Sequence, residues 1–221
     1  MIALFGWLWG GGEPPALEAD RFLDVLLPAR CPVCFLRDMF GADFIRGLLT
    51  ESVNDGKLRK NLLDAGGFCS RHAWKAATLG DHLGMAILYE SLLDDQLRKL
   101  GKRRWVPLRS RECPACSHEN EVERAYAAQF IRWWSGSDLF RNTFREKGGL
   151  CLRHADMVLY RGMPSETRLE LLRAFRPKSA ACLEELRAFL RKQNYDRAES
   201  PTDAEEWAWL EAVRLVTGDK T

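Results

Sequence analysis

The sequence predicts an all-α fold made of two pseudo-symmetric helical repeat units, each closed by a Cys3His metal site, and a C-terminal helix. Three observations lead to this prediction. A cysteine and histidine pattern occurs twice at one fixed offset, apolar residues recur at helical spacing between the motifs, and no stretch of useful length alternates as a strand does. Repetition of a whole ligand pattern in register indicates that one unit was duplicated with its chemistry intact.

The repeated pattern supplies a complete set of metal ligands in each copy. The first copy is C-P-V-C followed by G-F-C-S-R-H, and the second copy, 82 positions later, is C-P-A-C followed by G-L-C-L-R-H. Both copies leave 34 residues between the two half-motifs. Three thiolates and one imidazole make a full tetrahedral set. The predicted ligands are Cys31, Cys34, Cys69 and His72 in the first unit and Cys113, Cys116, Cys151 and His154 in the second.

Each half-motif is expected at the start of a helix. Pro32 and Pro114 fit the first helical position, where the missing amide hydrogen costs nothing. In C-x-x-H the cysteine and histidine are three residues apart, so both face one side of a helix. We expect the two half-motifs of one unit to meet when the helices between them fold back as a hairpin, which would explain the span of 34 residues.

Apolar spacing predicts the helices between and after the motifs. The expected core face comprises Leu36, Phe40, Phe44 and Leu48, with Val122, Tyr126 and Phe130 in the same register of the second copy. Short helices are expected over 55–63 and 137–145, ended by Gly66-Gly67 and Gly148-Gly149 at positive φ. Longer helices are expected over 81–100, with Leu83, Ile87, Leu93, Leu97 and Leu100 on one face, and from residue 165 onward, with a break or kink at Pro177. A capping box, Thr202 with Glu205, is expected to open the final helix.

The identity of the metal is open at this stage. Two zinc ions per chain are the expected cofactors, because closed sites of three cysteines and one histidine are typical of structural zinc. Iron–sulfur clusters are the alternative, and a redox-active dithiol in the C-x-x-C pairs is another. Covalent haem is disfavoured, since Phe35 rather than histidine follows Cys34.

Other polar residues have expected roles beside the sites. Arg71 and Arg153 stand between cysteine and histidine in both copies, where a guanidinium would offset the negative charge of the thiolates, or contact an anion or a partner. Cys182 is expected in the core, and His82 and His118 in solvent.

A basic run over residues 98–111 is the densest charge cluster. It is either a solvated linker between the units or a contact for an anion or a nucleic acid, because basic residues and an aromatic ring together bind single strands. The candidate contacts are Arg98, Lys99, Lys102, Arg103, Arg104 and Trp105.

Composition is that of an ordinary globular protein. The 221 residues carry a net charge of +2 with 29% charged residues, which gives no global argument for nucleic acid. Seven cysteines, six of them in the motifs, and no secretory signal favour the reducing cytoplasm over a disulfide framework. Residues 1–9 are apolar but too short to span a bilayer that needs about 20 residues. We expect them to pack on the protein or a second subunit, or to make peripheral membrane contact.

The expected organisation is an apolar arm at 1–14, the first unit at 15–100, the second unit at 101–194, and a linker with a C-terminal helix at 195–221. With its C-P-x-C and G-x-C-x-R-H motifs, the chain resembles an uncharacterised prokaryotic family with duplicated CPxC…GxCxxH motifs, over most of residues 28–190. The resemblance supports metal sites and carries no established activity that could be transferred to this chain. No catalytic constellation is recognisable, so we expect a non-enzymatic adaptor that binds a protein partner or forms a homo-oligomer. The alternatives are an iron–sulfur electron-transfer or redox-sensing protein and a nucleic-acid binder.

Overall fold

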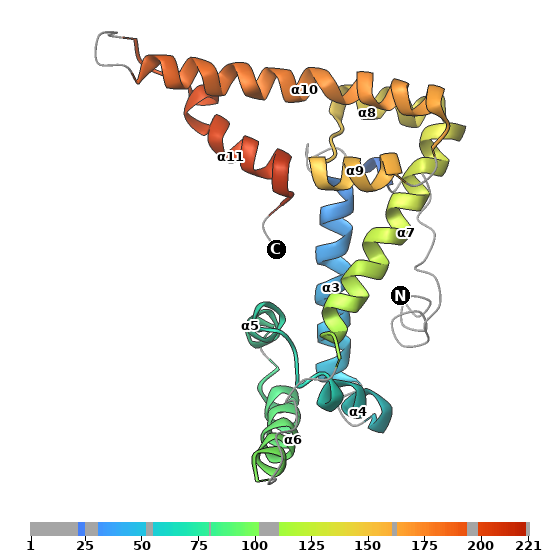
Figure 1. Ribbon diagram of the computed structural model, residues 1–221, viewed down its shortest axis with the longest axis vertical. Helices are drawn as coiled ribbons and strands as arrows, with labels where there is room; N and C mark the ends of the chain where they lie inside the picture. The colour runs from blue at the N-terminus through green and yellow to red at the C-terminus, as the bar shows by residue number, and fades with distance from the viewer. Residues whose placement is uncertain are drawn as a thin grey trace. The chain divides into compact units, whose positions relative to one another are not determined.

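The computed structural model describes residues 22–24, 31–51, 55–79, 81–101, 111–160, 163–193 and 199–219. In these residues all regular secondary structure is helical, as predicted (Figure 1). The helices are α3 (Pro32–Thr50), α4 (Gly56–Asp64), α5 (Ser70–Thr78), α6 (His82–Leu100), α7 (Pro114–Gly136), α8 (Asp138–Lys147), α9 (Leu152–Tyr160), α10 (Ser165–Lys192) and α11 (Asp203–Thr217). Within the described ranges, none of these helices has the length and apolar character needed to cross a membrane.

The chain forms two compact units whose boundaries fall inside α3 and α7. Among the described residues, unit 1 holds those between 37 and 123, and unit 2 holds those up to 36 and from 124 onward. These two compact units differ from the two units predicted from the sequence at 15–100 and 101–194. The latter are called repeats from here on, because they are the two copies of the duplicated sequence. The first residues of α3 belong to unit 2, and the first residues of α7 belong to unit 1.

The core of unit 1 lies on one face of α3. Phe40, Phe44 and Leu48 are buried there, as the four-residue spacing predicted. Leu62 of α4 and Leu92 of α6 are buried in the same unit. Helix α6 packs against both α4 and α5.

Unit 2 has an aromatic core. Phe130 meets Phe140 and Phe144 edge to face, with ring centroids 5.3 and 5.4 Å apart, and it stacks on Trp134 at 6.0 Å. Trp134 is fully buried and donates its indole N–H to the backbone oxygen of Thr167, 3.3 Å away. Because buried aromatic rings remove large apolar areas from water, this cluster anchors α7, α8 and α10 together.

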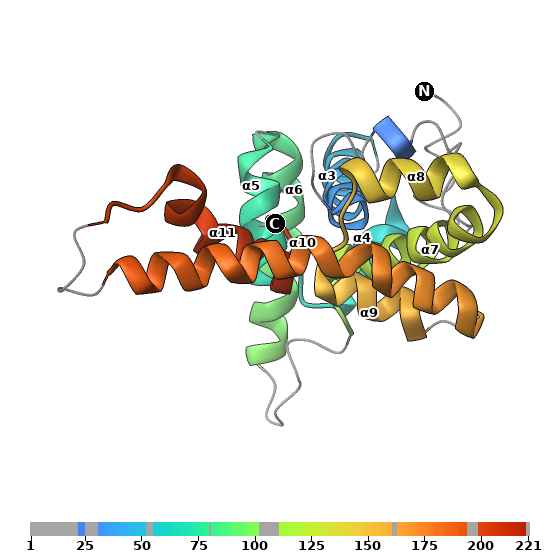
Figure 2. The ribbon, with the colours of Figure 1, turned by 90° about the horizontal axis from the view of Figure 1, so that it is seen from above.

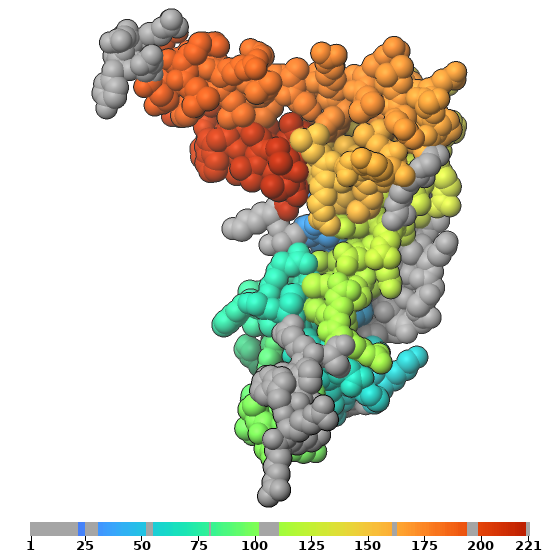
Figure 3. All heavy atoms as spheres, viewed as in Figure 1, coloured from blue at the N-terminus to red at the C-terminus, as the bar shows by residue number. Residues whose placement is uncertain are grey.

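Helix α10 is the long element of unit 2, and α11 folds back along it (Figures 1 and 2). In the space-filling view α11 also lies against α9, which carries one half-motif (Figure 3). A capping box of Thr202 and Glu205 opens α11, as predicted. Cys182 of α10 is buried, and its thiol faces the backbone oxygen of Ala208 of α11 at 3.8 Å. Its expected place in the core is therefore confirmed.

The helices differ from the sequence predictions at three places. Helix α10 is continuous through Pro177, so the chain does not break there; α10 packs against α8 and α11, and Leu171 and Cys182 are buried on either side of the proline. Gly66 and Gly67 have φ of 65° and 89°, but Gly148 has φ of −87°. A Cβ at Gly148 would lie 2.7 Å from Cδ2 of Phe144, so a close contact and not positive φ requires glycine there.

The third difference concerns α6. Its predicted apolar face is mostly exposed, because α6 turns the adjacent face, with Gly84, Leu88 and Leu92, toward its unit. The exposed apolar residues of α6 are Leu83, Leu93, Leu97 and Leu100.

Candidate metal centres

All eight predicted ligands come together in two clusters, but each cluster combines half-motifs from different repeats. Site I, in unit 1, consists of Cys69, His72, Cys113 and Cys116, and site II, in unit 2, consists of Cys31, Cys34, Cys151 and His154. In each cluster the four ligand atoms lie within 4.8 Å of one another, so each could hold a metal ion. The prediction that each repeat closes its own site is therefore wrong.

The length of α3 explains the exchange of half-motifs. Cys31 precedes the first residue of α3, and a 19-residue helix carries the chain about 28 Å away from that end. The nine residues of α4 span only about 14 Å, about half the length of α3, and Cys69 lies in a different cluster from Cys31. The hairpin expected from the 34-residue span does not form.

All four half-motifs begin helices in the same way. The backbone oxygens of Cys31, Cys69, Cys113 and Cys151 each accept the first helical hydrogen bond, at 2.8 to 3.1 Å, so these cysteines are N-cap residues. Pro32 and Pro114 occupy the first helical position, as predicted. Each site is thus built from two helix N-termini, whose partial positive charge favours the thiolate form of cysteine.

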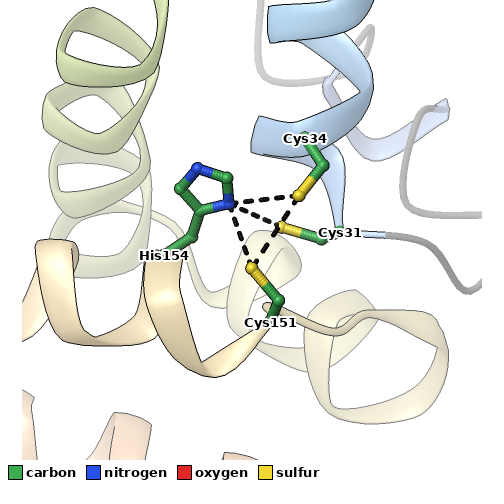
Figure 4. A group of neighbouring side chains, drawn as sticks. All are labelled: Cys31, Cys34, Cys151 and His154. Atoms are coloured by element: carbon green, nitrogen blue, oxygen red, sulfur yellow. Dashed lines mark hydrogen bonds between the residues drawn. The ribbon is translucent and has the colours of Figure 1, made fainter. Parts of the chain in front are cut away.

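Site II is closed (Figure 4). Nδ1 of His154 points at the three sulfurs, 3.3 Å from Cys31, 3.3 Å from Cys34 and 3.2 Å from Cys151. The sulfurs of Cys34 and Cys151 are 3.8 Å apart. All four side chains are buried.

Site I has the same geometry but is more open. Nδ1 of His72 lies 3.3 Å from the sulfur of Cys69, 3.5 Å from Cys113 and 3.4 Å from Cys116, and the sulfurs of Cys69 and Cys116 are 3.7 Å apart. His72 and Cys113 are buried, whereas Cys69 and Cys116 are only half-buried.

Glu119 orients the histidine of site I. Its Oε1 lies 2.9 Å from Nε2 of His72, which directs Nδ1 toward the sulfurs, as in the carboxylate–histidine pairs of metal sites. Its Oε2 pairs with Arg71, and Lys75 approaches Oε1 at 3.8 Å. The carboxylate is almost completely buried and Gly41 makes room for it, since a Cβ there would come within 2.7 Å of Oε1.

Sequence reasoning missed Glu119. Its spacing from a predicted ligand could have revealed it. Glu119 follows Cys116 by three residues on α7, so the two side chains share one face of the helix. The repeat gave no help, because the equivalent position 82 residues earlier is Arg37, which pairs with Glu123 at 3.2 Å.

The charges of site I shift its pKa values. Burial lowers the pKa of His72, but hydrogen bonds to Cys113 and Glu119 outweigh burial and raise that pKa to about 9. Burial opposes ionisation of Cys113, yet the hydrogen bond from His72 and backbone N–H groups lower its pKa to about 6. Without a metal, site I therefore favours an imidazolium beside a thiolate.

The two arginines of the motifs lie beside the sites. Burial lowers the pKa of Arg71, but its ion pair with Glu119 and a hydrogen bond to Cys116 outweigh burial and raise that pKa. In site II the pKa of Cys151 falls to about 3, chiefly through hydrogen bonds from Cys31 and Cys34, with a smaller contribution from the charge of Arg153.

The expectation for His118 was wrong, and that for His82 was right. His118 is buried with its ring stacked on Phe44, the centroids 4.5 Å apart, and burial lowers its pKa to about 4. It occupies the position equivalent to Leu36 on the core face of the repeat, where a flat ring replaces an aliphatic side chain. His82 is exposed.

Gly218 closes site II from outside the repeats. This residue caps α11 with φ of 96°, and a Cβ there would lie 2.8 Å from the sulfur of Cys34 and 3.4 Å from that of Cys151. Only a residue without a side chain fits against the two thiols. The C-terminal helix, which the sequence did not connect with a site, thus covers one.

The basic run is only partly described. Arg98 and Lys99 form ion pairs with Asp94 and Asp95 one helical turn earlier, at 2.8 and 2.7 Å, so neither charge is uncompensated. Lys102, Arg103, Arg104 and Trp105 lie outside the described residues, as do residues 1–9 of the apolar arm.

Fold and sites define a class of helical proteins in which each of two Cys3His clusters combines half-motifs from both sequence repeats. A family of unknown function (DUF6062) matches residues 25–106. The chain is also 31% identical over 198 residues to the "Uncharacterized 23.9 kDa protein in xynA 3'region" of Caldicellulosiruptor sp. (strain Rt8B.4), which covers 86% of this chain and 95% of that protein. The chain belongs to this uncharacterised family. No solved structure matches it.

Proposed function

We propose that the chain is a non-enzymatic zinc protein, with one structural ion at each site, that acts as an interaction module. The observation that carries the proposal is the spacing of the donor atoms. With Zn–S bonds of about 2.3 Å and Zn–N bonds of about 2.0–2.1 Å, a tetrahedral ion places its sulfurs about 3.8 Å apart and sulfur from nitrogen about 3.6 Å apart. The sulfur pairs at 3.7 and 3.8 Å and the sulfur–nitrogen pairs at 3.2 to 3.5 Å agree with this.

The same spacing favours one ion over an iron–sulfur cluster. A cluster binds its ligands through different iron atoms, so irons and bridging sulfides stand between the cysteine sulfurs. Ligand atoms that all lie within 4.8 Å of one another leave room for a single ion. Both sites offer four protein donors, which is the closed set of structural zinc and leaves no open position for a substrate.

The role as an interaction module rests on exposed apolar side chains in each unit. In unit 1 four of them lie on α6, and in unit 2 four lie on α11, where Trp207, Trp209, Val213 and Val216 are all at least half exposed. Large exposed apolar residues grouped on one helix are typical of surfaces that bind other proteins. A protein partner or a second copy of the chain is the proposed occupant.

Elemental analysis of the protein as purified tests the metal. We expect two zinc ions per chain; iron with acid-labile sulfide, or no metal, would refute the proposal. Light scattering and pull-down experiments test the interaction. The double variant Trp207→Ser, Trp209→Ser should associate less with a protein partner or with a second copy of the chain. Tyr160→Ser is the matched control, because Tyr160 is 83% exposed in the same unit but lies on α9. Equal effects of the two changes would contradict a binding role for α11.

A further inference from the structure

We propose that site I is a thiol-oxidation site, at which Cys69 and Cys116 form a disulfide and release the bound ion, whereas site II resists the same oxidant. The inference rests on the proposed zinc occupancy of both sites. It assigns different roles to two sets of donors that are identical in composition.

The first observation is the pairing of accessible sulfurs. Cys69 and Cys116 are the two half-buried ligands of site I, and the other two ligands are buried. Their sulfurs are 3.7 Å apart, although the residues are 47 positions apart in the chain. An oxidant that reaches one of these sulfurs therefore finds a second thiolate in contact with it.

Site II supplies an internal comparison. Cys151 and Cys34 are the repeat equivalents of Cys69 and Cys116, and their sulfurs are 3.8 Å apart, so the two pairs have the same geometry. Cys34 has no exposed surface and Cys151 only 2%. Gly218 contributes to this difference, because a Cβ there would lie only 2.8 Å from the sulfur of Cys34 and 3.4 Å from that of Cys151.

The chemistry needs a two-electron oxidant such as hydrogen peroxide. One thiolate attacks peroxide, giving a sulfenic acid and hydroxide, and the second thiolate then displaces hydroxide as the sulfur–sulfur bond forms. Two protons from solvent convert the two hydroxides to water. The balanced result is one disulfide, two water molecules and a released Zn²⁺, since a site that has lost two of its four ligands no longer holds the ion.

A disulfide has an S–S length of about 2.05 Å, so the two sulfurs, 3.7 Å apart, need to approach by about 1.7 Å for the bond to form. Cys113 is the competing partner, but it is buried, whereas Cys69 and Cys116 are only half-buried. The accessible pair is therefore the one that reacts.

The test uses the full-length protein with its zinc measured beforehand. Graded hydrogen peroxide is added, released zinc is followed with a chromophoric chelator, and disulfides are located by differential alkylation and peptide mass spectrometry. We expect one of two zinc ions to leave, at a rate at least about tenfold above the second, with a Cys69–Cys116 disulfide and with Cys34 and Cys151 still reduced. Release of both ions at equal rates, release of neither, or a disulfide through Cys113 overturns the inference. Absence of zinc before peroxide refutes the proposed function instead.

A glycine substitution tests the reason for the difference. Gly218→Ala places a methyl group against Cys34 and strains the backbone, so it should lift the end of α11 and let peroxide release both ions at comparable rates. Gly136→Ala is the matched control, because a Cβ there meets nothing within 4 Å. If Gly218→Ala binds two zinc ions and site II still keeps its ion in peroxide, the explanation that α11 protects site II is wrong. If the variant does not fold, the measurement on the wild-type protein still decides the inference.

Discussion

Replacement of Glu119 should weaken metal binding at site I alone. The carboxylate holds Nε2 of His72 at 2.9 Å and is almost completely buried, so Glu119→Gln removes the negative charge that orients and polarises the ligand. Loss of such an outer partner typically lowers metal affinity about 10- to 100-fold, which is about 1.4–2.7 kcal/mol. We expect that loss at site I and none at site II.

Glu123→Gln is the control for burial. Glu123 lies one helical turn further along α7, is equally buried, and pairs with Arg37 instead of a metal ligand. Its replacement should reduce stability toward urea without changing metal affinity. The assay is a chelator competition with each step quenched by alkylation, so that labelling of Cys69 or Cys34 identifies the site that has lost its ion. Unchanged affinity in Glu119→Gln, or an equal loss in Glu123→Gln, would refute the role of the carboxylate.

Three further predictions concern ligand pairing, pH and the C-terminal helix. We expect one zinc ion per chain in the double variant Cys34→Ser, Cys151→Ser, because both changes fall in site II, and no zinc ion in the double variant Cys34→Ser, Cys69→Ser, because each site loses a ligand. Native mass spectrometry counts the ions, and the reverse result would show that ligands pair within repeats. Because His72 in metal-free site I is protonated below a pKa of about 9 and must lose that proton to bind metal, apparent affinity should fall about tenfold per pH unit below 9 from this group. Competition titrations at pH 7 and 8 would show this difference. Thr202→Ala should cost about 1 kcal/mol in urea unfolding through loss of the α11 cap, and an unchanged midpoint would contradict it.

The sequence was sufficient for local structure and for naming the eight residues that gather in the two Cys/His clusters. Helix starts at Pro32 and Pro114, the buried stripe of α3 and the capping box of α11 each follow from a few neighbouring residues, and all are present. The eight ligands could be named because duplication made them recur in register.

Pairing could not be predicted in the same way, because the two C-x-x-C motifs are chemically alike. Either could meet either C-x-x-H, and the choice depends on the length of unbroken helix after each C-x-x-C. Continuity of α3 from Pro32 to Thr50 decided it, through the distance between its ends. Glu119 and Gly218 were missed for a related reason: both act at one site only, so the repeat that revealed the ligands concealed them.

The exchanged half-motifs have a consequence for the origin of the protein. A chain with a single repeat carries one C-x-x-C and one C-x-x-H, and in this structure the two half-motifs of a repeat lie in different clusters. Two such chains contain the same eight donors as this one, and by exchanging half-motifs they complete both sites as a homodimer. Fusion of the two genes then preserves both centres without new ligands, and it frees each copy to diverge. Glu119 in one half and the α11 cover in the other are differences that a symmetric homodimer, with two identical sites, cannot have.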